Sequence, residues 1–463
     1  MPDSYSWRRE WGALILAAVV ALPLFTPRLY GADEIKYITH LRSVYFDGDV
    51  DYFNDYDLLL RRDPVANAWL HNLRDAPTVT GRRLNDAPIG AALLWSPFYV
   101  VADLVVVVAR AFGVDLDRSG YGALYVWGVC LGSLFWGLSG LALTYRICRR
   151  FYGVRASRFA VLGLWFASTL VFYLYITPPM AHASSLFAVA LFLWLWLRTR
   201  DNRSALQWLA LGAAGGLMVL VRELNWLLFI PPAVDEGWKL LSDVRRHGVG
   251  AAVQPLCGAA LLTIAVGVVV APQFMVYRAL HGSFSPSPFV LDKFVPYPRH
   301  ALEVLFSGFH GLYSWTPVTL MGTAGLWFFG RKHPVLASGM AAAFLVQVLV
   351  VGSYATWAGG ASFGARRFIN FVPIFALGLA ALVDRVPPLR QRWVAVGLAA
   401  LIIWNFGLAL QYATGIIPRD QPVAMRTIVF NQLVHVPQRT AGVAWRFFTD
   451  RWSLVENAPG GSR

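Results

Sequence analysis

An acidic pair, Asp33-Glu34, follows the first apolar segment of the chain. The next residues place Ile35, Ile38 and Leu41 at helical spacing, which predicts an amphipathic helix with Asp33 at or near its N-terminus. The positive end of the helix dipole keeps a carboxylate ionised at that position. An ionised carboxylate there is a candidate general base towards a hydroxyl group, and the alternative is an N-cap on a surface helix.

Several cations accompany this acid, and arginine binds phosphate through two parallel hydrogen bonds. Arg222 stands out because it ends an apolar segment, where a charge is costly unless it is paired or functional. We expect these cations to suit a lipid-linked phosphate or pyrophosphate. The alternative interpretation of any single one of these residues is that it binds no ligand and extends its charged end from the membrane edge into water. They are Lys36, Arg42, Arg82, Arg83, Arg222, Lys293, Arg299, Arg366 and Arg367.

Two further polar residues lie at the mouths of apolar segments. Asp86 precedes Pro88, which suits a helix start, so Asp86 is a plausible N-cap as well as a candidate ligand contact. His182 opens an apolar segment and is either a ligand contact or a structural histidine.

No residue is assigned to a metal. The acids Asp47, Asp49 and Asp51 resemble a loop that binds a cation, but the later ligands of a calcium loop are missing. A solvated turn is the favoured interpretation, and a divalent cation stays possible.

The elements that must position these residues are membrane spans. Hydrophobic residues make up 57% of the 463 residues and charged residues 14%, with a mean hydropathy of +0.51. Soluble domains carry about 25% charged residues, so the composition predicts an all-α polytopic membrane protein. The net charge of +14 then indicates the positive-inside bias of membrane loops rather than a nucleic-acid partner.

Charge also predicts the topology. The loop at 146–158 is the most basic and the N-terminus carries Arg8 and Arg9, so both are expected in the cytoplasm. Only one span then fits between the first outer loop and Arg146, and the apolar run 88–112 becomes a juxtamembrane or re-entrant helix. This gives about 11 spans, near 11–29, 121–145, 158–176, 182–198, 205–234 (two short spans broken at Arg222-Glu223), 253–277, 311–329, 335–352, 367–384 and 393–412.

The predicted organisation is a transmembrane domain over 1–412 and a short extracytoplasmic tail over 413–463. The first extracytoplasmic loop, 30–120, is the longest, and its stretch 30–87 holds ten of the 26 acids of the chain. The short tail favours a lipid or glycan acceptor over a polypeptide.

This layout resembles the GT-C superfamily of membrane glycosyltransferases, which use polyprenyl-phosphate sugars. The resemblance extends to bacterial relatives of the protein O-mannosyltransferases and the lipid A aminoarabinose transferases. It rests on four short motifs, which are Gly31-Ala32-Asp33-Glu34 with Tyr37, Gly81-Arg82-Arg83-Leu84-Asn85-Asp86-Ala87-Pro88-Ile89-Gly90, Val221-Arg222-Glu223-Leu224-Asn225, and Gly359 to Arg367.

The resemblance implies an inverting transfer of a sugar from a polyprenyl phosphate to the hydroxyl of a lipid or glycan acceptor. It makes Asp33 the base, with Glu34 beside it as the second catalytic candidate. Asp86 and His182 compete with Glu34 for the helper role. The implied location is a bacterial inner membrane, with the site facing outwards. The side chains implied to bind substrate are Lys36, Tyr37, Arg82, Arg83, Asp86, His182, Arg222, Arg366 and Arg367.

One departure concerns the turn at Thr177-Pro178-Pro179-Met180, where many relatives carry a second acid. The missing acid puts a two-carboxylate metal site in doubt. The alternative function is a secondary transporter or a flippase for lipid-linked sugars, which predicts an internal repeat and charges within spans. The sequence shows no such repeat, and apart from Arg222-Glu223 its spans are almost free of charge.

Overall fold

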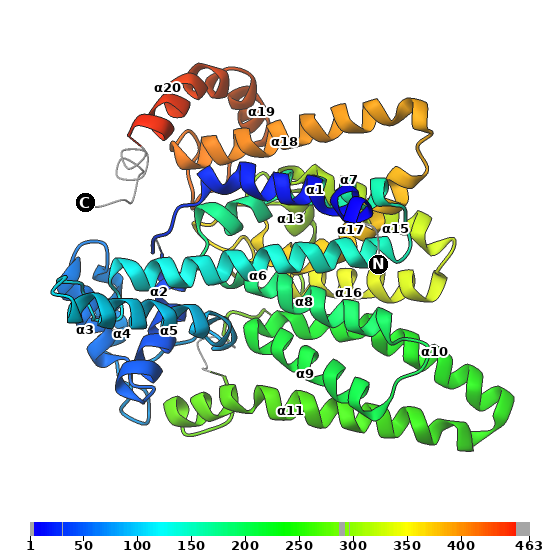
Figure 1. Cartoon of the computed structure of the whole chain (residues 1–463), viewed down its shortest axis with the longest axis horizontal. Coiled ribbons are helices and arrows are strands. Elements are labelled where there is room, and N and C mark those ends of the chain that lie inside the picture. Colours follow the sequence, from blue (N-terminus) through cyan, green and yellow to red (C-terminus); the bar gives the residue numbers. More distant parts are fainter. Residues whose placement is uncertain (1–3, 30, 287–291, 296, 451–463) are drawn as a thin grey trace.

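A computed structural model describes residues 4–29, 31–286, 292–295 and 297–450 of the chain (Figure 1). It is 74% helical, and these ranges contain no β-strand. The all-α membrane fold predicted from the sequence is confirmed. The side chains of Arg8 and Arg9 and the tail beyond residue 450 lie outside the described part.

The α-helices follow one another as α1 (Ser4–Ala21), α2 (Ala32–Arg42), α3 (Phe53–Arg62), α4 (His71–Arg74), α5 (Gly90–Ala111), α6 (Ala123–Arg149), α7 (Val154–Phe166), α8 (Ala181–Arg198), α9 (Ala205–Val221), α10 (Ile230–His247), α11 (Val253–His281), α13 (Ala301–Phe306), α14 (Leu312–Trp315), α15 (Pro317–Gly330), α16 (Pro334–Gly352), α17 (Val372–Asp384), α18 (Gln391–Ala413), α19 (Met425–Leu433) and α20 (His435–Thr449). Short turns of 3₁₀- or π-helix lie between them, among them η2 (Ser43–Asp47), η4 (Phe172–Ile176), η5 (Glu223–Phe229) and η7 (Arg366–Phe371).

Within the described residues, seven helices are long and apolar enough to cross a membrane. They are α5, α6, α8, the helix over 249–281, α16, the helix over 366–384, and α18. Shorter apolar helices cover 10–24 and 205–221. Helices therefore lie where the apolar runs predicted them, but several of these runs are broken.

The run 158–176, predicted as one span, is interrupted between α7 and η4. The Ser168 hydroxyl donates to the Leu164 carbonyl (2.5 Å), and the Leu170 N–H donates back to that hydroxyl (3.2 Å). A serine side chain that bonds the backbone in this way competes with the helix ladder.

The break predicted at Arg222-Glu223 is confirmed. Helix α9 ends at Val221, and Arg222 is extended with φ −153° and ψ 122°. The chain then continues through η5 into α10, so Arg222 lies in a short non-helical link between two helices.

Helix α5 packs antiparallel on one half of α6. The Tyr125 hydroxyl donates to Asp103 (2.5 Å), and further along the Trp136 indole donates to the Leu94 carbonyl (2.7 Å). Beyond that point α6 packs on α8, where a Cβ at Gly140 would lie 2.8 Å from the backbone nitrogen of Phe187. Helix α5 thus packs on the half of α6 that is remote from Arg149. Whether α5 is re-entrant stays a prediction.

The first loop folds into a compact cap of helices α2, α3 and α4 (Figure 1, left). Buried His40 holds this cap together, because its Nδ1 lies 2.8 Å from the Tyr52 hydroxyl and its Nε2 lies 2.8 Å from the Ala87 carbonyl. Asp55, also buried, accepts a hydrogen bond from the Tyr121 hydroxyl (2.7 Å). The two His40 contacts fix α2 against segments that follow it in the chain, at Tyr52 and at Ala87.

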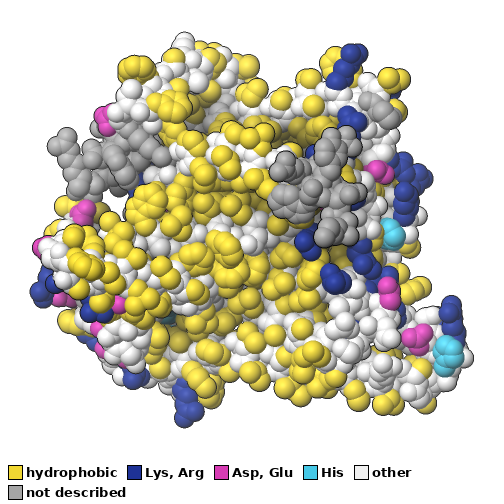
Figure 2. Space-filling model, in the orientation of Figure 1, with side chains coloured by type: hydrophobic (Ala, Val, Ile, Leu, Met, Phe, Trp, Pro, Cys, Tyr) yellow, Lys and Arg dark blue, Asp and Glu magenta, His cyan; other side chains and the backbone are white. Residues whose placement is uncertain are grey.

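Hydrophobic side chains cover the middle of the molecule, and Lys and Arg gather at the end opposite the cap (Figure 2). We call this the basic end and define it by Arg146, Arg149, Arg150 and Arg198, at the C-termini of α6 and α8. An apolar belt with a basic margin is typical of a membrane protein.

Candidate active site

The N-terminus of α2 presents Asp33. Gly31 is the extended N-cap residue (φ −136°, ψ 171°), and its N–H donates to the Glu34 carboxylate (3.2 Å). Asp33 lies in the first turn, as the sequence predicted, where the helix dipole favours its negative charge. The Asp33 side chain is 45% exposed, whereas Glu34 is 2% exposed. Asp33 is therefore the more accessible of the two acids.

Arg366 is distant from Asp33 in the sequence but contacts it in the structure. Its Nη1 donates to Asp33 Oδ2 (2.8 Å), and its Nη2 donates to the Gly359 carbonyl (3.3 Å). Burial raises the pKa of Asp33, but the attraction of Arg366 and Lys36 outweighs this and leaves that pKa below its ordinary value. Asp33 is consequently a carboxylate at neutral pH.

Glu34 behaves differently although it is the next residue. Burial raises the pKa of Glu34 to about 8, against the opposing effects of the Gly31 N–H and of Arg28. At neutral pH this carboxyl group holds a proton, and a protonated acid cannot accept another from a substrate. The two acids thus differ in charge because their surroundings differ.

Arg222 and His182 form the second part of the site. Arg222 Nη1 lies 2.7 Å from His182 Nδ1. Arginine has only donors, so His182 accepts through Nδ1 and carries its own proton on Nε2. The His182 ring also packs against Tyr173, with ring centroids 4.5 Å apart. The charge of Arg222 acts on Asp33, so both lie in one electrostatic cluster.

Asp86 connects two lysines beside this cluster. It forms an ion pair with Lys36 and another with Lys293, whose Nζ lies 3.5 Å from Asp86 Oδ2. The interpretation of Asp86 as an N-cap is wrong: α5 begins at Gly90, and its N-cap position is Ile89, without a side-chain cap. The carboxylate instead lies between the two lysines, which neutralise its charge.

Tyr37 and Arg367 border the cluster. Tyr37 packs edge-on against Trp95 at 6.0 Å, and burial raises the pKa of its hydroxyl, which stays protonated. Arg367 donates to the carbonyls of Thr356 and Trp357, both at 2.8 Å, and lies 4.8 Å from the Tyr354 ring centroid. Arg367 therefore anchors the loop that precedes Arg366.

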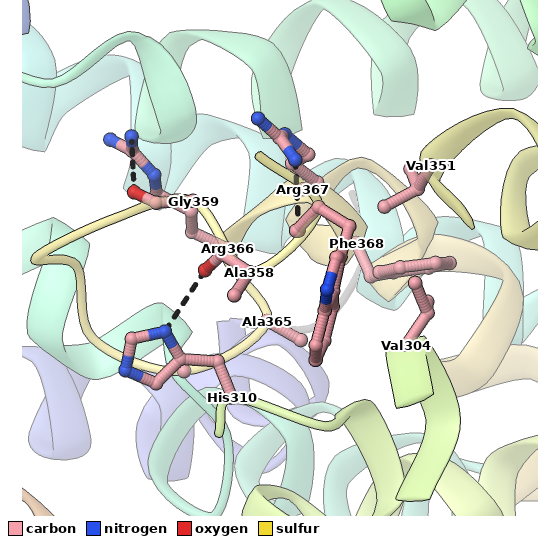
Figure 3. A pocket seen from close by; sticks show the side chains of 11 residues that line it. Val304, His310, Val351, Ala358, Gly359, Ala365, Arg366, Arg367 and Phe368 are labelled. Carbon is pink, nitrogen blue, oxygen red and sulfur yellow. Dashed lines mark hydrogen bonds between the residues drawn. The ribbon is translucent and has the colours of Figure 1, made fainter. Parts of the chain in front are cut away.

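A small pocket lies behind these arginines. Figure 3 shows the guanidinium groups of Arg366 and Arg367 on one side of it and the His310 imidazole on the other. His310 has a left-handed backbone (φ 60°), and its Nδ1–H donates to the Ala358 carbonyl (2.9 Å). A non-glycine residue in this conformation persists only where its surroundings hold it, and the bond to Ala358 joins His310 to the loop that precedes Arg366.

Comparison with known proteins places this arrangement in a known fold. The chain resembles ArnT from Cupriavidus metallidurans, whose structure is known in the apo state and bound to undecaprenyl phosphate. The apo structure gives a TM-score of 0.54 at 15% identity over 93% of this chain and 75% of ArnT. The bound structure gives 0.52 at 16% identity over 97% and 79%. The chain has the fold of ArnT.

The sequence match is narrower than the structural one. Residues 122–272 match the family described as dolichyl-phosphate-mannose-protein mannosyltransferase. A search of curated proteins gave no match. The GT-C resemblance expected from the sequence is confirmed by the family match and the fold together.

Two predicted contacts, Arg82 and Arg83, bond backbone carbonyls rather than the side chains of this cluster. Arg82 donates to the Ala279 carbonyl (2.9 Å), and Arg83 donates to the carbonyls of Arg74 (2.8 Å) and Gly81 (2.7 Å). Arg82 thus bonds the last turn of α11, and Arg83 bonds the end of α4 and the turn before Asp86.

The acids expected as a possible cation loop do not converge. Asp47 pairs with Arg42, Asp49 accepts from the Ser43 hydroxyl (3.0 Å), and Asp51 accepts from the Arg83 N–H (3.0 Å). Among the described residues, no group of three or more His, Cys, Asp or Glu side chains could hold a metal ion.

His40 is the supporting residue that sequence reasoning missed. It lies seven positions after Asp33, two turns along the same helix face, and that spacing was the available signal. Its neutral imidazole bridges Tyr52 and Ala87, and burial lowers its pKa to about 4. Such a bridge sets the position of α2, and with it that of Asp33.

Proposed function

We propose that this protein is an inverting glycosyltransferase that moves a sugar from a polyprenyl-phosphate donor to an acceptor hydroxyl. The observation that carries the proposal is the ion pair of Asp33 with Arg366, set beside Arg222 and Lys36. One ionised carboxylate among several cations provides a base next to a binding surface for phosphate.

The proposed step balances as a single displacement. The acceptor oxygen attacks the anomeric carbon and transfers its proton to Asp33. The bond between that carbon and the phosphate oxygen breaks on the opposite face, and polyprenyl phosphate leaves with the electron pair. Asp33 is a weak base, so stabilisation of the departing phosphate must supply much of the driving force.

Arg366 has two tasks in this scheme. Before the donor binds, it holds the Asp33 carboxylate in place. A bound phosphate offers oxygens that compete for the same guanidinium, which weakens its hold on Asp33 and makes the carboxylate a better base. Substrate binding and activation of the base are thereby coupled through one side chain.

The other side chains receive supporting roles in the proposal. Arg222, fixed by His182, neutralises the phosphate together with Lys36, and Tyr37 offers a hydroxyl and a ring to the sugar. Asp86 positions Lys36. Protonated Glu34 is a buried neighbour rather than the base. The proposal omits Arg82 and Arg83, because both are bonded to backbone carbonyls.

The fold of ArnT, solved with undecaprenyl phosphate, supports a polyprenyl-phosphate donor here. The acceptor we propose is a lipid or a glycan. The proposed location is a bacterial inner membrane, with Asp33 on the extracytoplasmic side because Arg146 and Arg149 mark the opposite end.

The test is sugar transfer by the purified protein in nanodiscs, with a panel of polyprenyl-phosphate sugars and a membrane lipid extract. Wild type is compared with Asp33→Asn and with Asp115→Asn, an exposed acid outside the site. We expect sugar-dependent release of polyprenyl phosphate by wild type and Asp115→Asn but not by Asp33→Asn. Equal release by all three proteins would remove Asp33 from its role, and release by none would favour the transporter or flippase.

A further inference from the structure

An open pocket lies at the basic end, between the N-terminal part of α1 and the C-terminal ends of α6 and α8. Arginines and tryptophans form most of its wall. The residues that matter for the argument are Trp11, Arg146, Arg149, Arg150, Trp194 and Arg198. Neither the proposed reaction nor the comparisons give this pocket a role.

The pocket is remote from the candidate active site. Helix α8 carries His182 in its first turn and Arg198 at its end. Sixteen residues of helix rise roughly 24 Å. A phosphate in contact with Arg222 and His182 therefore cannot also reach Arg198, and the pocket is a separate place.

The four arginines differ in their partners. Arg149 donates to Glu10 (3.0 Å) and to the Tyr152 carbonyl (2.7 Å), and Arg150 lies 3.9 Å from Asp201. Arg146 and Arg198 have no carboxylate within ion-pair distance among the described residues. These two guanidinium groups carry the charge that an anion in the pocket would meet.

Tryptophan rings hold these two guanidinium groups. Arg146 lies 5.7 Å from the ring centroid of Trp11, and Arg198 lies 5.1 Å from that of Trp194. A guanidinium over an indole face keeps its N–H donors available at the ring edge. The pocket thus presents two oriented cations between aromatic walls.

An apolar track leads away from the pocket along α1. Ile15 and Val19 follow Trp11 at intervals of four, so the three side chains form one stripe on the helix. Ile15 is 46% exposed and Val19 is 56% exposed. A free phosphate would make no hydrophobic contact with such a stripe, whereas the acyl chains of a lipid would pack against it.

We propose that this pocket binds the phosphate head group of an anionic phospholipid, with its acyl chains along the Trp11, Ile15 and Val19 stripe. Arg146 and Arg198 contact the phosphate, and the indoles lie at the level of the glycerol. Basic pockets between membrane helices with tryptophan at the interface suit this class of lipid. The site is independent of the sugar-transfer reaction.

The test uses the full-length protein in a neutral detergent, with phosphatidylglycerol as the probe. Arg146→Gln/Arg198→Gln removes both charges but keeps the aliphatic stems. Arg245→Gln/Arg246→Gln is the matched control, because it removes two exposed arginines at the end of α10, outside the pocket. Native mass spectrometry measures retained lipid, and the thermal midpoint without lipid shows that each variant folds.

We expect wild type and the control to retain phosphatidylglycerol, and the pocket variant to bind it roughly tenfold or more weakly. Phosphatidylcholine with the same acyl chains should bind all three proteins weakly. Equal retention by the pocket variant and the control would overturn the proposal. An equal stabilisation of wild type by inorganic phosphate alone would also overturn it, since the pocket would then be a site for free anions.

Discussion

Asp33 and Arg366 are 333 positions apart in the chain, yet their side chains form an ion pair of 2.8 Å. Asp33 belongs to the first loop, and Arg366 opens the helical segment that continues into α17. The pair therefore joins the cap of short helices to the helical bundle. Its geometry fixes both the position of the proposed base and its charge.

The first prediction concerns this charge. Arg366→Gln removes the strongest attraction on the Asp33 carboxylate, so the pKa of Asp33 rises. An acid with a higher pKa takes up its proton at a higher pH, and the acidic limb of the kcat/KM profile should shift upwards. The turnover should also fall, because the phosphate loses a cation.

The control for this experiment is Arg61→Gln, which removes a 78% exposed arginine from α3. Its pH profile should match that of wild type. An unchanged acidic limb in Arg366→Gln would show that Arg366 does not govern the protonation of the base.

The second prediction uses the raised pKa of Glu34. Its ordinary value of 4.5 becomes about 8 in the folded protein. Stability from the protonated form is fully present below about 4.5 and is lost as the pH rises through about 8. Glu34→Gln mimics the protonated form, so its thermal midpoint should fall less than that of wild type between about pH 5 and about pH 8.

Glu303→Gln serves as the comparison, since this acid is half-exposed on α13. It should lose stability with rising pH as wild type does. Parallel curves for Glu34→Gln and wild type would mean that Glu34 is already ionised in the folded protein.

The third prediction addresses the bridge made by His40. His40→Ala leaves the buried Tyr52 hydroxyl and the Ala87 carbonyl without their partner. Each buried polar group without a partner costs about 1–3 kcal/mol, so the loss in the free energy of unfolding for the two groups should be roughly 2–6 kcal/mol. Chemical denaturation in detergent measures it, and His71→Ala, at a half-exposed position, should change stability little. A loss no larger than that of His71→Ala would contradict the bridge.

Much of the fold follows from local sequence patterns. Apolar runs predict the spans, and the run of Ile35, Ile38 and Leu41 predicts α2 with Asp33 in its first turn. The break at Arg222 is visible because a charge interrupts an apolar segment. These features depend on neighbours in sequence, which is why they are predictable.

Features that depend on tertiary contacts are harder to predict from the sequence. Asp86 looked like a helix cap, but Lys36 and Lys293 hold it from other segments. Arg82 and Arg83 bond carbonyls at the ends of α11 and α4, and their role in substrate binding stays a prediction. The role of a charged side chain depends on the residues that it contacts. These residues lie far away in the chain, and a single sequence does not show which they are.

The fourth prediction tests how α5 supports Arg222. A Cβ at Gly90 would lie 2.4 Å from the backbone of Leu220 and Val221, just before Arg222. Gly90→Ala must push the two segments apart, at a cost of about 1–3 kcal/mol in stability, and should also displace Arg222 and reduce sugar transfer. Gly237→Ala is the control, because a Cβ there meets nothing within 4 Å and alanine favours the helix. Full transfer activity in Gly90→Ala would mean that the contact does not set the position of Arg222.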